Sequence, residues 1–70
     1  MEKLDIEIST EYIKLDQLLK FSAVAENGAH AKDIILNDNV LLNGVRAVER
    51  GRKIRTGDVV TVGDIEIHVC

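Results

Sequence analysis

The sequence contains few of the residues that small domains use for covalent bridges or for stacking on bases. In 70 residues there is no proline and one cysteine, Cys70, which cannot form an internal disulfide. The aromatic residues are Tyr12 and Phe21 alone. We therefore expect an aliphatic core, and a single-strand binder that stacks bases on aromatic rings is disfavoured. A single cysteine also fits a reducing, cytoplasmic compartment.

Long apolar runs and catalytic motifs are also missing. No run approaches the ~18 apolar residues of a membrane span, and Met1-Glu2-Lys3 does not begin a signal peptide. The residues His30, His68 and Cys70 do not have the spacing of metal ligands. There is no nucleophile motif and no phosphate-binding glycine loop. We therefore expect no membrane partner, no metal, no cofactor and no enzymatic activity.

A chain of this length predicts one domain over residues 1–70 with a thin core and little room for a substrate cleft. Hydrophobic residues make up 46% and charged residues 30%, which is the composition of a folded domain rather than a disordered one. No repeat or low-complexity segment divides the chain. We expect the domain to be monomeric.

The net charge is −3, but the positive charge is concentrated in one stretch. Residues 1–40 contain four basic and eight acidic side chains, whereas residues 41–57 contain five basic and one acidic. The five basic residues are Arg46, Arg50, Arg52, Lys53 and Arg55. Such a group is a candidate for phosphate contacts, because Lys and Arg release counterions and the arginine fork matches phosphate oxygens. The alternative is a solvated hairpin and loop.

Apolar spacing predicts one strand and two helices in the first half. Residues 3–8 alternate apolar and polar side chains, as in a half-buried strand. Apolar residues recur at helical spacing over residues 15–25 and 29–36. Asn27 and Gly28 should separate the helices, because both tolerate positive φ. With only two or three residues between them, the helices should pack as a tight helix-turn-helix pair.

The second half predicts hairpins. Asn43-Gly44 joins strands over residues 40–42 and 45–48, and Gly63-Asp64 joins strands over 59–62 and 65–69. Residues 51–53 should form a basic connection. The predicted fold class is α+β, with two short packed helices on one face of a small antiparallel sheet.

Four segments in this order resemble the S-four (S4) RNA-binding domain, first described in small-subunit ribosomal protein S-four. They are Lys14-Leu15-Asp16, residues 29–35 with Lys32, the turn Val40-Leu41-Leu42-Asn43-Gly44, and residues 54–60 with Gly57-Asp58. The resemblance covers about residues 13–62. In its size the chain resembles the small stand-alone bacterial members of the YaaA/YbcJ type. One departure is that many members have Ser/Thr-Arg where this chain has Asn27 and Gly28.

The resemblance implies an RNA-binding module for structured RNA, plausibly ribosomal RNA, with a role in ribosome assembly or translation. The alternative is an adaptor whose acidic surface contacts a basic protein, for example a ribosomal protein. The candidate RNA-binding residues are Lys14, Lys20, Gly28, His30, Lys32, Asn43, Arg46, Arg50, Arg52, Lys53 and Arg55.

Some of these candidates have plainer interpretations. Gly28 and Asn43 could serve as turn residues, and Gly28 could equally allow close approach of a backbone. His30 should be exposed near a helix start, where it could bind a phosphate or a 2′-hydroxyl or be an ordinary surface histidine. His68 should face solvent.

Overall fold

The first and last strands of the chain lie side by side in one sheet. In the computed structural model, which describes residues 2–70, β1 (Glu2–Ile6) pairs in parallel with β7 (Ile65–Val69). Antiparallel pairs then connect β7 to β6 (Val59–Val62), β6 to β3 (Leu41–Leu42), and β3 to the edge strand β4 (Val45–Arg46). The predicted α+β class is confirmed, and the sheet is mostly rather than wholly antiparallel.

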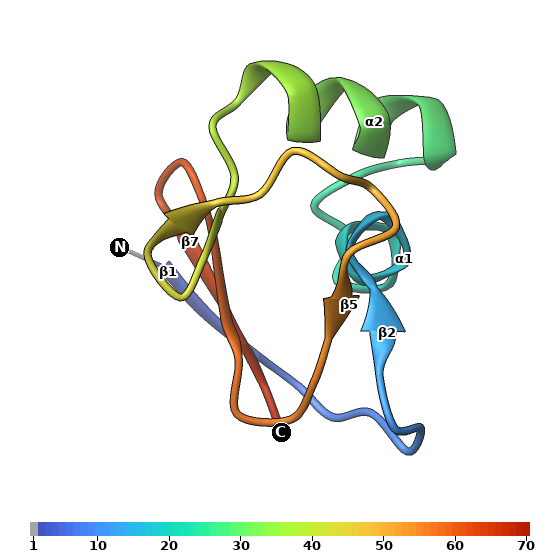
Figure 1. Cartoon of the computed structure of the whole chain (residues 1–70), viewed down its shortest axis with the longest axis vertical. Helices are drawn as coiled ribbons and strands as arrows, with labels where there is room; N and C mark the ends of the chain where they lie inside the picture. Colours follow the sequence, from blue (N-terminus) through green and yellow to red (C-terminus); the bar gives the residue numbers. More distant parts are fainter. Residues whose placement is uncertain (1) are drawn as a thin grey trace.

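The helices α1 (Leu15–Phe21) and α2 (Gly28–Asn37) pack against each other. A separate two-stranded sheet, β2 (Ile13–Lys14) with β5 (Lys53–Ile54), lies against α1. Figure 1 shows α1 end-on beside β2 and β5, with α2 along the top of the molecule. The predicted helix-turn-helix pair on a small sheet is therefore present.

The core among the described residues is aliphatic, as the shortage of aromatic residues predicts. The first helix contributes Leu15, Leu18 and Leu19, which are fully buried. The second helix contributes Ala31, Ile34 and Ile35, the apolar residues at helical spacing on one face. Val60 and Ile67, from the central strands of the sheet, belong to the same buried cluster. The helical spacing read from the sequence thus identifies the buried face of both helices.

The connection between the helices differs from the prediction. The first helix ends at Phe21 rather than residue 25, because Ala23 adopts a φ of 65° that a right-handed helix cannot contain. Asn27 and Gly28 were expected to separate the helices, but of the two only Asn27 lies between them, with an extended φ of −158°, and Gly28 is the first residue of α2. Asn27 is instead the N-cap of α2, and its Oδ1 accepts a hydrogen bond from the His30 N–H at 2.8 Å.

Strand limits also shift. The predicted strand over residues 3–8 ends at Ile6, and the one over 45–48 ends at Arg46. Residues 51–53 were expected to be a connection, but Lys53 joins Ile54 in β5. Its partner β2 was missed because two-residue strands have no readable alternation. Ile54 is buried opposite Ile13 in this pair, and this burial holds the ladder against the core.

Both predicted hairpin turns are confirmed. Asn43 and Gly44 have φ values of 51° and 84°, the consecutive positive φ pair of a type I′ turn. Gly63 has a φ of 58° at the start of the β6–β7 turn.

Candidate RNA-binding surface

The basic loop before β5 caps helix α1. The Arg52 carbonyl accepts a hydrogen bond from the Leu15 N–H at 2.9 Å, and the Arg50 carbonyl accepts one from the Asp16 N–H at 3.0 Å. The N-cap residue Lys14 gives no side-chain cap of its own. The loop therefore supplies the acceptors that a helix N-terminus needs, and these two bonds fix its backbone against α1.

The β2–β5 pair places two lysines side by side. Lys14 and Lys53 are direct cross-strand partners, and both are exposed. Like charges directly opposite each other destabilise a sheet, by an amount on the order of the 0.2–1 kcal/mol that a favourable cross-strand pair contributes. The Lys53 Nζ lies 4.9 Å from the centroid of the Tyr12 ring, and this cation–π contact offsets part of the repulsion. We call the four exposed residues Lys14, Arg50, Arg52 and Lys53 the cationic surface.

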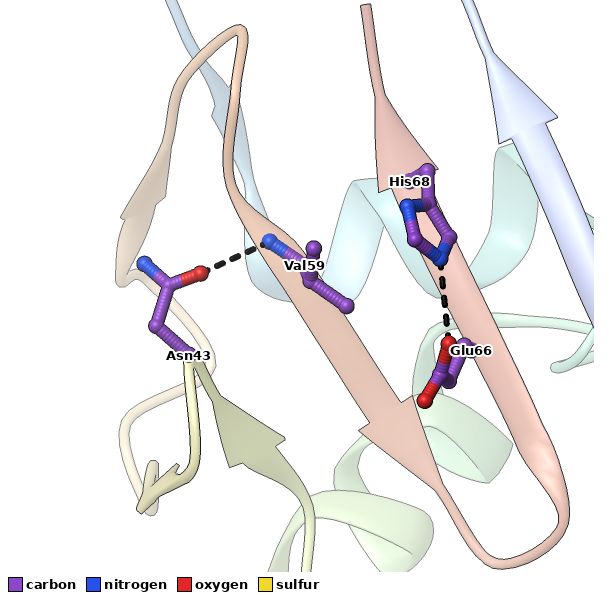
Figure 2. Close-up of polar contacts among 4 residues, drawn as sticks. All are labelled: Asn43, Val59, Glu66 and His68. Atoms are coloured by element: carbon purple, nitrogen blue, oxygen red, sulfur yellow. Dashed lines mark hydrogen bonds and ion pairs between the residues drawn. The ribbon is translucent and has the colours of Figure 1, made fainter.

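The positive charges of this surface are not neutralised within the protein. Across residues 2–70, no lysine or arginine side chain forms an ion pair with a carboxylate. Among these residues, the one close acid–base contact joins the His68 Nε2 to the Glu66 Oε1 at 3.1 Å on β7 (Figure 2). His68, which was expected to face solvent, is half-buried, with 36% of its side chain exposed. The lysines and arginines remain available to an external anion.

The helix pair presents the remaining basic candidates. Lys20 lies in the last turn of α1 and Lys32 on α2, and both are exposed. His30 is exposed as expected, and its Nδ1 accepts a hydrogen bond from the Glu26 N–H at 3.0 Å. In the neutral ring this bond leaves the proton on Nε2, so that the free nitrogen is a donor.

Gly28 opens α2 without a structural need for glycine. Its φ is not positive, and a Cβ added at this position would meet nothing within 4 Å. Within the described chain, the Gly28 and Ala29 N–H groups have no hydrogen-bond partner, as is usual for the first residues of a helix. The space at the Cβ position of Gly28 is therefore open.

The structure divides the segment 46–55, which the charge count treats as one patch. Arg46 lies on the edge strand β4 opposite Leu41, in the five-stranded sheet. Arg50 and Arg52 lie at the start of α1. Arg55 follows β5 and begins a turn in which its N–H donates to the Asp58 Oδ2 at 2.8 Å. In Figure 1 the chain after β4 crosses below α2 before it reaches α1 and β5.

Both polar groups of Asn43 are used inside the protein. Its Oδ1 accepts a hydrogen bond from the Val59 N–H at 2.9 Å, as Figure 2 shows. Its Nδ2 donates to the Asp58 Oδ1 at 3.1 Å. Asp58 thus connects the Asn43-Gly44 turn to the turn that follows β5. We call this the Asn43–Asp58 junction. Both of its residues lie in motifs by which the sequence resembles the family, Asn43-Gly44 and Gly57-Asp58.

Two further properties concern the residues from 2 to 70. Neither α1 nor α2, with 7 and 10 residues, is long and apolar enough to cross a membrane. No group of three or more His, Cys, Asp or Glu side chains in this part of the chain could hold a metal ion.

Comparison with known proteins assigns the family. The model of the S4 domain matches residues 6–70. A curated relative from Bacillus subtilis (strain 168), described as "Probable ribosome maturation protein RlbA", is 42% identical over 57 residues. That match covers 81% of this chain and 80% of the relative. The chain belongs to the S4 domain family, the RNA-binding family that its four motifs resemble.

Proposed function

We propose that this protein binds structured ribosomal RNA through the cationic surface and the neighbouring helix pair, and that it acts in ribosome maturation without catalysing a reaction. Membership of the S4 family supports RNA binding, and the description of the Bacillus subtilis relative supports a ribosomal target. The observation that carries the proposal is the pairing of Lys14 with Lys53 beside a loop that is hydrogen-bonded to α1.

The arrangement suits a duplex or folded RNA. Structured RNA is recognised by shape, phosphates and 2′-hydroxyls, so the protein needs donors in a fixed array rather than aromatic platforms. The backbone bonds of Arg50 and Arg52 fix the loop that carries their guanidinium groups. Each phosphate contact releases counterions, and the planar guanidinium can bind two phosphate oxygens at once.

The helix pair extends this site in our proposal. The open N-terminus of α2 at Gly28 favours a phosphate, because helix N-termini carry partial positive charge. His30 would donate from Nε2 to a phosphate or a 2′-hydroxyl, while Lys20 and Lys32 add longer-range attraction. The protein would work as a cytoplasmic monomer without a metal or cofactor.

A matched pair of double variants tests the site. Arg50→Gln with Arg52→Gln removes two charges from the cationic surface, and Lys3→Gln with Arg46→Gln removes two charges from the five-stranded sheet. We expect the first pair to weaken binding to a ribosomal RNA stem-loop by at least about tenfold in fluorescence anisotropy. The second pair should change affinity by less than about threefold, because it alters only the long-range field. Equal losses would mean that net charge, not this surface, controls binding.

Crosslinking in cells tests the target. Ultraviolet crosslinking of the full chain, followed by sequencing of the attached RNA, should recover ribosomal RNA segments in the wild type and lose them in the Arg50/Arg52 variant. Recovery of messenger or transfer RNA instead would refute the ribosomal assignment while RNA binding itself would stand.

A further inference from the structure

The N-terminal segment carries the entire net charge of the protein. Residues 2–13 contain four acidic side chains and one basic one, while residues 14–70 contain eight of each sign. The acidic residues of this segment are all exposed, and they are Glu2, Asp5, Glu7 and Glu11. Residues 2–13 are therefore an anionic region of the sequence, separate from the basic loop.

A hollow of about 190 Å³ lies within this region. It is lined by Glu7, Ile8, Ser9, Thr10, Ile13 and Phe21. Phe21 is 66% exposed although it is one of two aromatic residues in the chain. Ile8 and Ile13 beside it are half-buried, so the apolar surface is continuous rather than a single stray side chain. Exposed apolar patches rimmed by charge are typical of interaction sites.

We propose that this acidic-apolar surface docks an extended, lysine- and arginine-rich segment of a partner protein, with one apolar side chain of that segment in the hollow. The charges are complementary, and Phe21 provides the aromatic contact. A hollow of this size suits one side chain rather than a helix face. The surface is thus distinct from the RNA site proposed above and does not depend on it.

Two other occupants fit less well. RNA would meet Glu7 in the lining of the hollow and the exposed Glu11 next to Thr10 in the chain, and both repel phosphates. A symmetric contact with a second copy of the chain would bring the same acidic residues face to face. A basic polypeptide meets neither obstacle.

The backbone beside the hollow favours an extended partner. Within the described chain, Ser9, Thr10 and Glu11 make no backbone–backbone hydrogen bonds. Their N–H and C=O groups could pair with a bound strand, as in other complexes where an extended peptide lies along exposed backbone. Ile13 and Lys14 are consecutive in β2, so their side chains point to opposite faces. The hollow and the cationic surface therefore lie on different sides of this strand.

The test uses two nine-residue synthetic peptides and the full chain. Each peptide has eight lysines and arginines around a central residue, which is leucine in one and serine in the other. We expect the leucine peptide to bind about tenfold more tightly, because it buries an apolar side chain. Amide shifts in NMR titration should concentrate on residues 7–13 and Phe21. Equal affinities, or shifts centred on Arg50 and Arg52, would overturn the proposal.

Three variants complete the design. Phe21→Ser should abolish the preference for leucine, and Glu7→Gln with Glu11→Gln should weaken both peptides by at least about threefold. Val45→Ser, which changes another exposed apolar residue, should leave both affinities unaltered. Loss of the preference in Val45→Ser, or self-association that Phe21→Ser abolishes in sedimentation, would contradict a partner in the hollow. RNA affinity should be equal in wild type and Phe21→Ser, so the two proposals can fail separately.

Discussion

At the Asn43–Asp58 junction the polar side chains bind other groups of the same chain, whereas at the cationic surface no side-chain charge is neutralised by a carboxylate. Both regions contain motif residues by which the sequence resembles the S4 family. Asn43 and Asp58 align two turns and the start of β6, and their hydrogen-bonding capacity is largely used there. The lysines and arginines of the cationic surface keep their side-chain donors free for an external partner. We therefore propose that the shared motifs reflect the fold at the junction and the ligand at the cationic surface.

The largest expected effect follows from removing the cationic surface as a whole. Replacing Lys14, Arg50, Arg52 and Lys53 by glutamine should lower affinity for a ribosomal stem-loop by about 100-fold or more at low salt. The negative slope of log K against log salt concentration should become shallower by about 3, because fewer counterions are released. Anisotropy titrations at several salt concentrations measure both. An unchanged slope would show that these residues do not contact phosphates.

The Asn43–Asp58 junction should respond in stability rather than in binding. Asn43→Ala removes two hydrogen bonds. It also places alanine, which tolerates positive φ less well than asparagine, at a turn position with a φ of 51°. We expect a loss of about 2 kcal/mol in the free energy of unfolding, measured by urea denaturation. Asn43→Gly keeps the backbone conformation and separates the two causes. Reduced RNA affinity in a fully folded Asn43→Ala protein would mean that the amide also contacts RNA.

The open start of α2 allows a gain-of-function test. Gly28→Arg introduces the arginine that many members of the S4 family have at this position, and its Cβ would meet nothing within 4 Å. We expect RNA affinity to rise by about fivefold at low salt through one added phosphate contact. The control Gly28→Ala should leave affinity unchanged and stabilise the protein by up to about 0.5 kcal/mol. A destabilised Gly28→Arg protein would contradict the open space.

The smallest expected change concerns the stability of the lysine pair. Lys53→Gln relieves the repulsion with Lys14 and loses the contact with Tyr12, so the free energy of unfolding should move by less than about 0.5 kcal/mol. RNA affinity should still decrease by about threefold. Thermal denaturation and anisotropy on the same sample separate the two. A large destabilisation would show that Lys53 serves the fold.

Much of the fold could be predicted because local chemistry agrees with it. Asn43-Gly44 has a strong turn preference, and apolar residues at helical spacing mark the buried faces of both helices. The end of α1 could not be read, since alanine favours helices and Ala23 takes its positive φ only in the folded chain. There the Ala23 N–H bonds to the Lys20 carbonyl at 3.0 Å, and the Ala25 N–H to the Leu19 carbonyl at 2.9 Å.

The candidate site could be predicted only in composition. Counting charges finds Arg50, Arg52 and Lys53, and the family motif adds Lys14. The β2–β5 register that brings Lys14 and Lys53 together is a tertiary property of two-residue strands, so no local pattern encodes it. The Asn43-Gly44 hairpin predicts that Arg46 lies on a strand, and only the position of that strand at the sheet edge depends on tertiary pairing.

The position of β7 affects how the protein can fold as it is synthesised. This strand lies between β1 and β6, so residues 2–6 have no partner in the sheet until residues 65–69 have been made. Contacts over such a separation form late, because the intervening chain must first be closed into a loop. The helix pair can form earlier, since its contacts are local. The acidic strand β1 therefore acquires its place in the sheet only after residues 65–69 have been made.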